Sequence, residues 1–331
     1  MRRSSLSLLL IALIALAQEP QTPKPAPPPA TAPQEPSATT QPPANQPPAN
    51  HPPVKQPLVY AGKPLKLEVG CGDDDIASFG LTCSPDEPCN VFLELVGVEV
   101  LPGDRIFLTG NLHSETVTMW SILLTSGDAG KSWTEPLDRI KSTGLEQIQF
   151  ADLEYGWISG QQLLSLPRDP FVLLTIDGGK TWRKRPLSSE PRVGAVETFN
   201  FESRTTGQLL VDRTQTGDSG GRHELYETNT GGDTWSLREI SAKPLKLKRP
   251  RVPIAGWRLR ADGRTKTFNL EKQAGARWQV ITSFLIQTGE CKPAELTLQE
   301  PPPPTEEAKA EIVVPQSGSP RKSPTLKKKR R

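Results

Sequence analysis

The stretch that decides the fold covers eight residues and reads Thr175-Ile176-Asp177-Gly178-Gly179-Lys180-Thr181-Trp182. An apolar run, 171–174, precedes it, and a basic run, 183–185, follows it. Asp-Gly-Gly between two such runs predicts a tight hairpin, because the turn needs positive φ angles that glycine adopts at little cost. The Asp177 carboxylate can accept hydrogen bonds from backbone N–H groups of its own turn. The returning Trp182 can then cover the apolar side of the hairpin.

The same octet occurs twice more, as Ser126-Gly127-Asp128-Ala129-Gly130-Lys131-Ser132-Trp133 and as Thr228-Asn229-Thr230-Gly231-Gly232-Asp233-Thr234-Trp235. A degraded fourth copy, without the Asp, ends at Trp278. Each copy follows an earlier strand signal, and these signals begin at residues 107, 156, 206 and 256. A period of about 40–50 residues with roughly four short strands per unit is typical of propeller blades. We find no helical periodicity of about 3.6 residues. The sequence therefore predicts an all-β fold with four recognisable modules.

These octets resemble the Asp-box (BNR) repeat, which has the pattern Ser/Thr-x-Asp-x-Gly-x-Thr/Ser-Trp. The copies that end at Trp133 and Trp182 match it throughout, whereas the third has Thr230 in place of the Asp. The positions that the resemblance marks as structural are Ser126, Asp128, Gly130, Trp133, Thr175, Asp177, Gly179, Trp182, Thr228, Thr230, Gly232 and Trp235.

A second feature is more particular, the strand Gly156-Trp157-Ile158-Ser159-Gly160 followed by the 175–182 hairpin. This combination is similar to the blade of photosystem II assembly-factor-like propellers. The resemblance covers roughly residues 100–285 and implies a β-propeller that binds protein. Asp boxes also occur in sialidases, sortilin-type receptors and glycan-binding propellers, so the resemblance is specific for fold and unspecific for function.

The N-terminus has the features of an export signal. Two arginines precede an apolar run over 6–17 that ends in Ala15-Leu16-Ala17, which predicts a cleaved signal peptide at 1–17. The run is shorter than the roughly 20 residues of a membrane span. We therefore expect an exported, periplasmic or extracellular protein that does not span a membrane. Residues 18–57 are rich in Pro, Ala, Gln and Thr, and they predict a disordered, semi-rigid spacer.

The folded part is expected over 58–298, with a Cys-rich segment at its start. The four cysteines in an exported chain predict two disulfides with three possible pairings, and they are Cys71, Cys83, Cys89 and Cys291. One pairing of a clustered cysteine with Cys291 would tie the N-terminal segment to the end of the ring. A metal site is the alternative, but no histidine joins the cluster. The acidic run 73–75 is either a cation ligand or a solvated loop.

The number of blades stays open at the level of sequence. Residues 91–101 and 280–298 could combine into a fifth blade that closes the ring with strands from both ends, because closure removes exposed sheet edges. The alternatives are a four-bladed ring and an open array that a second chain completes.

The C-terminal region 299–331 is Pro-rich and basic, and we expect it to be disordered. Its last eleven residues hold seven positive charges, more than the net charge of +3 of the whole chain. Such an arm is suited to anionic polymers of the cell envelope, and the export signal argues against nucleic acid as the partner.

The sequence predicts no catalytic residues, no metal and no cofactor. Sialidases resemble one another in needing a tyrosine nucleophile, and tyrosine occurs here only as Tyr60, Tyr155 and Tyr226. We interpret Tyr226 as a blade-packing residue and Tyr155 as a loop residue. The Phe/Tyr-Arg-Ile-Pro motif has only a weak echo, Pro250-Arg251-Val252-Pro253, which lacks the aromatic. The nucleophile-elbow, P-loop and HExxH motifs are missing.

One internal basic cluster is a candidate binding patch, and it comprises Lys243, Lys246, Lys248, Arg249 and Arg251. In an extended segment Lys246 and Lys248 share one face, with leucines on the other. The cluster could contact an acidic partner, or it could be a protected edge strand. Our reading is an exported, non-catalytic propeller that scaffolds an unknown envelope protein, with a glycan-binding or sialidase-like glycan-hydrolysing propeller as the alternative. Exposed aromatics and converging carboxylates at the central channel would favour the alternative.

Overall fold

The structure is a computed structural model that describes residues 56–216 and 222–294. The expected signal peptide (1–17), nearly all of the spacer (18–57) and the tail (299–331) lie outside the described residues. The regular structure is almost entirely β, as predicted, with one short α-helix, α1 (Asp73–Phe79), and one 3-10 turn (Thr214–Thr216). Within the described ranges, no helix is long and apolar enough to cross a membrane.

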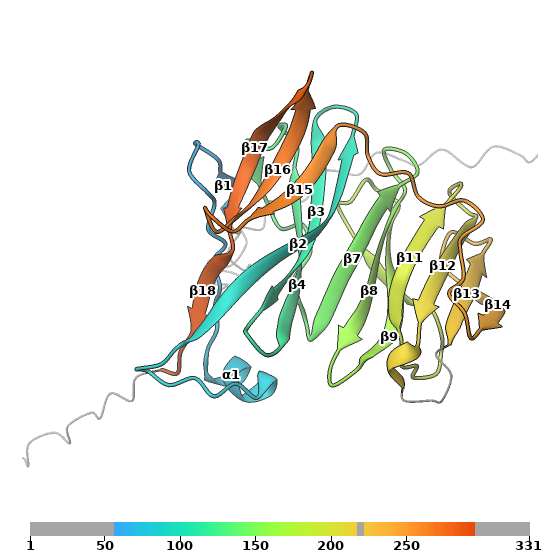
Figure 1. The fold of residues 1–331 in the computed structure, drawn as a ribbon, viewed down its shortest axis with the longest axis horizontal. Helices are drawn as coiled ribbons and strands as arrows, with labels where there is room; N and C mark the ends of the chain where they lie inside the picture. Colours follow the sequence, from blue (N-terminus) through green and yellow to red (C-terminus); the bar gives the residue numbers. More distant parts are fainter. Residues whose placement is uncertain (1–55, 217–221, 295–331) are drawn as a thin grey trace, which may run out of the picture. The chain divides into compact units, whose positions relative to one another are not determined.

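Four antiparallel sheets follow the predicted modules (Figure 1). The first sheet has the order β18 (Gln287–Cys291), β2 (Cys89–Leu101), β3 (Arg105–His113), β4 (Thr118–Ser126) and β6 (Ile140–Lys141). The second comprises β7 (Thr143–Phe150), β8 (Gly156–Leu163), β9 (Pro167–Thr175) and β10 (Arg183–Pro186). The third comprises β11 (Ala195–Phe201), β12 (Gly207–Asp212), β13 (His223–Thr228) and β14 (Ser236–Ser241). The fourth comprises β15 (Trp257–Asp262), β16 (Thr267–Ala274) and β17 (Arg277–Leu285). A separate pair joins β1 (Leu58–Val59) to β5 (Ser132–Trp133).

The second and third sheets are four-stranded antiparallel meanders, which is the blade unit of β-propellers. Strands β2, β3 and β4 of the first sheet pack against β7 of the second, and β11 of the third packs against β7, β8 and β9. The fourth sheet lies next to the first, because β15 packs beside β2. The sheets are thus neighbours in the order fourth, first, second, third.

The hydrophobic core is divided into clusters that lie between neighbouring sheets. One cluster joins the fourth and first sheets, a second joins the first and second, and a third joins the second and third. In β9, Val172 and Leu174 face the third sheet, whereas Phe171 and Leu173 face the first. The continuous apolar run at 171–174 follows from this, because successive side chains of a strand point to opposite faces and both faces are covered.

The two ends of the described chain meet in the first sheet. Strand β18 pairs with the start of β2, so the prediction that strands from both ends combine is correct in its pairing. Of the alternatives left open by the sequence, a separate fifth blade is not formed by the described residues, because β2 and β18 belong to the first module's own sheet and β17 belongs to the fourth. The two predicted disulfides are present, and Cys71–Cys291 ties the N-terminal segment to β18. The second disulfide, Cys83–Cys89, closes a short loop before β2.

The acidic run 73–75 forms the first turn of α1 rather than a loop. Asp75 pairs with Lys141 at 2.6 Å, and the Asp73 carboxylate accepts a hydrogen bond from the backbone N–H of Ala294 at 3.0 Å. Asp75 thereby attaches α1 to the first sheet, and Asp73 attaches it to the residues that follow β18. Among the described residues no cluster of three potential metal ligands occurs here or elsewhere.

Candidate functional site

The three octets form turns that join β4 to β5, β9 to β10 and β13 to β14. In the second, Asp177 Oδ1 accepts hydrogen bonds from the backbone N–H groups of Lys180 and Thr181, each at 3.0 Å, and Oδ2 accepts the Thr181 hydroxyl at 2.6 Å. Asp128 receives the same three bonds in the first turn, at 3.1, 2.9 and 2.6 Å. Both carboxylates are therefore occupied by their own turns, as the sequence predicted.

The electrostatics of these carboxylates fit a structural role. Desolvation alone would raise the pKa of Asp177, but hydrogen bonds from the side chain and backbone of Thr181 outweigh it and lower the pKa to about 2. The pKa of Asp128 is lowered to about 2 by the equivalent bonds from Ser132. A carboxylate that stays ionised and fully hydrogen-bonded is unsuited to act as a general acid or base at neutral pH.

The turns also fasten each sheet to its neighbour. Gly231 has a φ of +70° in the third turn, and a Cβ there would lie 2.6 Å from the carbonyl oxygen of Arg204. The carbonyl of Gly231 accepts a hydrogen bond at 2.8 Å from the indole of Trp157, which lies on β8 of the preceding sheet. That indole also stacks on Phe201 with ring centroids 3.7 Å apart. This close approach explains why position 231 is a glycine and why a tryptophan follows Gly156 in β8.

The closing tryptophans differ in burial. Trp133 is fully buried and its indole donates to Gly130 at 3.1 Å, whereas Trp182 is half-buried and donates to Gly179 at 3.1 Å. Trp235 is half-buried, but its indole nitrogen has no partner among the described residues. Trp278, the end of the degraded fourth copy, is exposed. It lies on the side of the fourth sheet that faces away from the first sheet.

A tyrosine, a glutamate and two arginines do come together, at the junction of the second and third sheets. Tyr226 donates to Glu224 at 2.9 Å, and Glu224 is paired with Arg192 at 2.7 Å and Arg213 at 2.9 Å. Burial, with the nearby Glu224 charge, raises the pKa of Tyr226, whereas a tyrosine nucleophile requires activation. Tyr226 is buried in the core between the sheets, in agreement with its predicted packing role.

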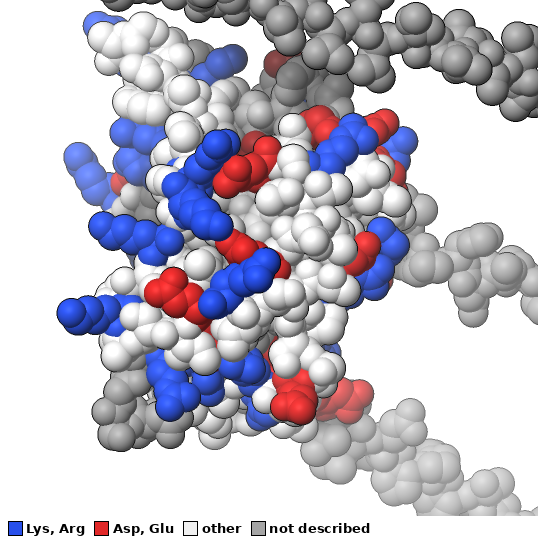
Figure 2. Space-filling model, turned by 90° about the vertical axis from the view of Figure 1, so that its right-hand side faces the viewer, with Lys and Arg blue, Asp and Glu red and all other residues white. Residues whose placement is uncertain are grey.

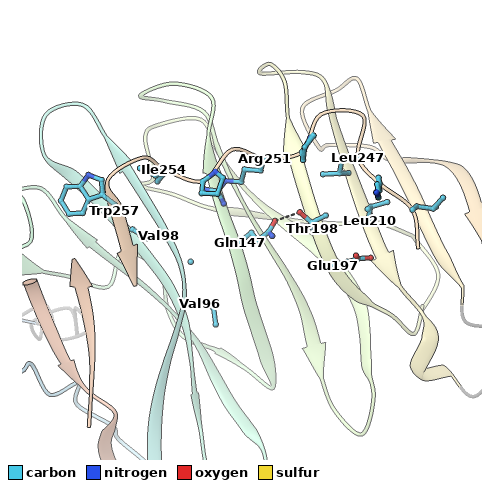
Figure 3. Close-up of a pocket in the computed structure, with 15 residues that line it drawn as sticks. Val96, Val98, Gln147, Glu197, Thr198, Leu210, Leu247, Arg251, Ile254 and Trp257 are labelled. Atoms are coloured by element: carbon cyan, nitrogen blue, oxygen red, sulfur yellow. Dashed lines mark hydrogen bonds between the residues drawn. The ribbon is translucent and has the colours of Figure 1, made fainter. Parts of the chain in front are cut away.

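A groove of about 660 Å³ lies where the first strands of the first three sheets come together (Figure 3). Strand β2 supplies Val96, Gly97 and Val98, and the other strands supply Gln147, Glu197, Thr198 and Leu210. The remaining wall is the chain between β14 and β15, which we call the 242–256 connection and which contributes Leu245, Lys246, Leu247, Pro250, Arg251, Pro253 and Ile254, followed by Trp257 of β15. The lining is therefore largely aliphatic.

The 242–256 connection holds the predicted basic patch, and the structure places it differently from an edge strand. No residue of the connection is in a strand. The predicted alternation is present, because Leu245 and Leu247 pack with Leu210 and Leu225 of the third sheet while Lys246 and Lys248 are exposed. The leucines cover the face of the third sheet that is turned away from the second.

Most of the patch cations are paired with carboxylates. Lys248 bonds to Glu227 at 2.8 Å, Arg249 to Glu202 at 3.2 Å, and Arg251 to Glu99 of β2. Figure 2 shows the face on the third-sheet side, where acidic side chains lie among the basic ones. The sequence-predicted patch is therefore largely an internal attachment of the connection. Two members of the patch, Lys246 and Arg251, line the groove, and of these Lys246 has no ion pair among the described residues.

The Glu99–Arg251 pair is the most buried of these attachments. Burial raises the pKa of Glu99 to about 7, against the opposing effect of Arg251, and burial lowers the pKa of Arg251. Neither the pairing nor the groove was apparent from the sequence, because Glu99 and Arg251 are 152 positions apart.

No protein-family model matches the chain, and no curated protein matches it in sequence. The solved structures that match it include two of YCF48 and several of glycoside hydrolases. A structure of YCF48 bound to D1 peptide is 16% identical over 60% of this chain and 54% of its own, with a TM-score of 0.32. YCF48 from Cyanidioschyzon merolae is 17% identical over 58% of this chain and 57% of its own, with a TM-score of 0.31. A GH74 xyloglucanase from Xanthomonas campestris is 18% identical over 40% of this chain and 18% of its own, with a TM-score of 0.30.

The chain thus spans little more than half of the YCF48 structures and under a fifth of the xyloglucanase. At these TM-scores the likenesses carry no argument about this chain. The description of its sheets as propeller-type blades rests on their strand order and on the cores between them.

Proposed function

We propose that this chain is an exported, non-catalytic protein of the β-propeller type that binds a segment of another envelope protein in the groove. The observation that carries the proposal is the chemistry of the groove lining. Its residues include one aromatic, Trp257, and one carboxylate, Glu197. Glycoside hydrolysis uses two carboxyl groups about 5–10 Å apart across the substrate. Aliphatic walls formed by strands and an extended connection suit a polypeptide segment better than a sugar chain.

The cores and turns around the groove hold its walls in fixed positions. Interdigitated cores join the first sheet to the second and the second to the third, and the glycine turns fasten each sheet to the one before it. A preformed groove loses little conformational entropy when a partner enters, which favours affinity. The two disulfides agree with an oxidising compartment outside the cytoplasm.

Affinity capture from an envelope extract tests the proposal with two matched variants of the full chain. Val96→Asp places a charge in the groove at a side chain that is 38% exposed, and Val59→Asp places the same charge on β1, outside the groove lining, at a side chain that is 66% exposed. We expect a discrete protein to be captured by the wild type and by Val59→Asp, and to be lost with Val96→Asp. Equal capture by all three proteins, or recovery of glycans with hydrolysis products, would contradict the proposal.

A further inference from the structure

The end of the fourth sheet at which β16 turns into β17 has an exposed surface that the groove does not use. Every residue from 272 to 280 is exposed. The segment before β15 lies at the same end, because the backbone N–H of Gln273 donates to the carbonyl of Gly256 at 2.8 Å and Trp257 is paired with Lys272. We define the hairpin surface as residues 272–280 together with Ala255, which directly precedes Gly256.

The hairpin surface combines apolar side chains with positive charge. Val280 is 41% exposed and Trp278 37%. The tip between the strands is Gly275 and Ala276, which are small and uncharged. None of the residues of the hairpin surface is acidic, and two of them, Lys272 and Arg277, are cationic.

The cations of this surface are not neutralised. Among the described residues neither Lys272 nor Arg277 has an ion pair. The neighbouring carboxylate of Glu271 is held by Arg258 at 2.7 Å and by Arg260 at 2.8 Å. Arg258 also lies over the ring of Trp278, 4.1 Å from its centroid.

Both faces of the hairpin end are exposed. Lys272 and Gln273 point to opposite faces of β16, as successive residues of a strand do, and both are exposed. A folded partner with a flat surface would cover one face, whereas a fluid phase can surround both. Tryptophan with flanking Lys or Arg is the composition found at the boundary between lipid headgroups and acyl chains.

We propose that the hairpin surface binds an anionic lipid bilayer. Trp278 and Val280 enter the interfacial region, and Lys272 and Arg277 contact headgroup phosphates. The contact is peripheral and reversible, because few apolar side chains are inserted and, of the described residues, only two cations without ion pairs, Lys272 and Arg277, lie near the anionic surface. This proposal does not depend on a partner in the groove.

The test uses the full chain with vesicles of phosphatidylcholine and phosphatidylglycerol that carry brominated acyl chains. Bromine quenches the fluorescence of an inserted indole, so quenching reports insertion rather than attraction alone. Measurement in 1 M salt screens the basic tail, because the screening length falls to about 3 Å. We expect quenching of the wild type in 1 M salt and its loss in Trp278→Ala. In low salt, Arg277→Gln is expected to weaken partitioning about fivefold on anionic vesicles and to leave partitioning on phosphatidylcholine alone unchanged.

A matched pair of surface variants guards against a folding defect. Val280→Asp introduces a negative charge on the hairpin surface, at a side chain that is 41% exposed, and is expected to weaken partitioning at least fivefold, because it opposes both insertion and the anionic headgroups. Ile240→Asp introduces the same charge on β14, at a side chain that is 51% exposed, and should leave partitioning unchanged. Unaltered thermal melting of both variants checks the fold. Undiminished quenching in Trp278→Ala, or equal effects of the two Asp variants, would overturn the proposal, as would binding that disappears entirely in 1 M salt.

Discussion

At the scale of single residues, the three octet turns form a natural comparison. They share backbone geometry, but the third has Thr230 where the others have aspartate. The Thr230 hydroxyl accepts the backbone N–H of Thr234 at 2.9 Å and lies 2.9 Å from the Thr234 hydroxyl. In the third turn, one neutral hydroxyl oxygen therefore replaces the two oxygens of a charged carboxylate. Bonds to an ionised acceptor are roughly twice as strong as neutral ones, so the third turn should be the weakest.

We expect Thr230→Asp to raise the free energy of unfolding by about 1 kcal/mol, because it restores the charge-assisted bonds of the other turns. The pKa of the equivalent Asp177 is lowered to about 2 from an ordinary value of 3.8. A depressed carboxyl pKa stabilises the fold above pH 4 and loses this effect as the pH falls towards 2. Urea unfolding at pH 7 and pH 3 checks both points. A gain of the same size at both pH values would mean that the carboxylate is not its source.

The indole hydrogen bonds provide a second comparison between turns. Trp182 donates to Gly179 at 3.1 Å, whereas the indole nitrogen of Trp235 has no partner among the described residues. Replacement by phenylalanine removes a hydrogen bond in the first case only. We expect Trp182→Phe to be about 1 kcal/mol more destabilising than Trp235→Phe in urea unfolding. Equal losses of stability in the two variants would show that the Trp182 hydrogen bond contributes nothing beyond the packing of the ring.

At the scale of elements, the 242–256 connection takes over part of the role of a neighbouring sheet. Gln208 occupies in β12 the position that Trp157 occupies in β8, since each follows a glycine paired with the last residue of the next strand. Trp157 binds the turn of the next sheet, whereas Gln208 accepts the backbone N–H of Lys248 at 2.9 Å. The connection thus covers a face on which no sheet packs among the described residues.

The buried Glu99–Arg251 pair of this connection predicts that loss of the arginine lowers the free energy of unfolding in a pH-dependent way. We expect Arg251→Ala to destabilise the fold by about 3 kcal/mol at pH 8, because it leaves the Glu99 carboxylate buried without its partner. The pKa of Glu99 is already raised to about 7 by burial. A raised carboxyl pKa means that the cost appears as the pH rises, so the loss should be smaller at pH 5. Urea unfolding at the two pH values measures it.

Arg249→Ala is the matched control for that prediction. Its side chain is 75% exposed and paired with Glu202 at 3.2 Å, so we expect a loss below about 0.5 kcal/mol at either pH. A loss for Arg251→Ala that is equally small, or one that grows as the pH falls, would contradict the proposed burial of the pair.

The sequence was informative about local structure and less so about tertiary pairing. The turns and the alternation of Leu245 and Leu247 follow from short-range patterns, and the structure has them. The number of disulfides follows from the cysteine count, whereas the sequence left their pairing open. The pairing of Arg251 with Glu99 could not be predicted, because it depends on which strand the connection crosses. The exposure of Trp278 could not be predicted either, because it depends on whether another sheet packs beside the fourth.

At the scale of the whole described molecule, its two ends are joined covalently and by strand pairing. Cys71–Cys291 is separated by 220 positions, whereas Cys83–Cys89 is separated by six. In the chain-entropy account, a disulfide stabilises by restricting the unfolded chain, and a longer loop is restricted more. Strand β18 and the N-terminal segment should therefore depend strongly on the first disulfide.

We expect replacement of Cys71 and Cys291 by alanine to lower the free energy of unfolding by about 5 kcal/mol, against about 2 kcal/mol for replacement of Cys83 and Cys89. Urea unfolding of the two double variants, compared with the oxidised wild type, measures the difference. Equal losses would indicate that native packing around the bonds, and not loop closure, dominates.

Site-specific photocrosslinking tests the central claim, that the groove binds a protein, most directly. A photoreactive amino acid replaces Val96 in the groove or, as the control, Ile240 on β14, and each full-length protein is irradiated in an envelope extract. The account predicts a discrete crosslinked protein from position 96 that is missing from position 240. Crosslinks of equal yield from both positions, or none from position 96 while glycans are bound or cleaved, would contradict it.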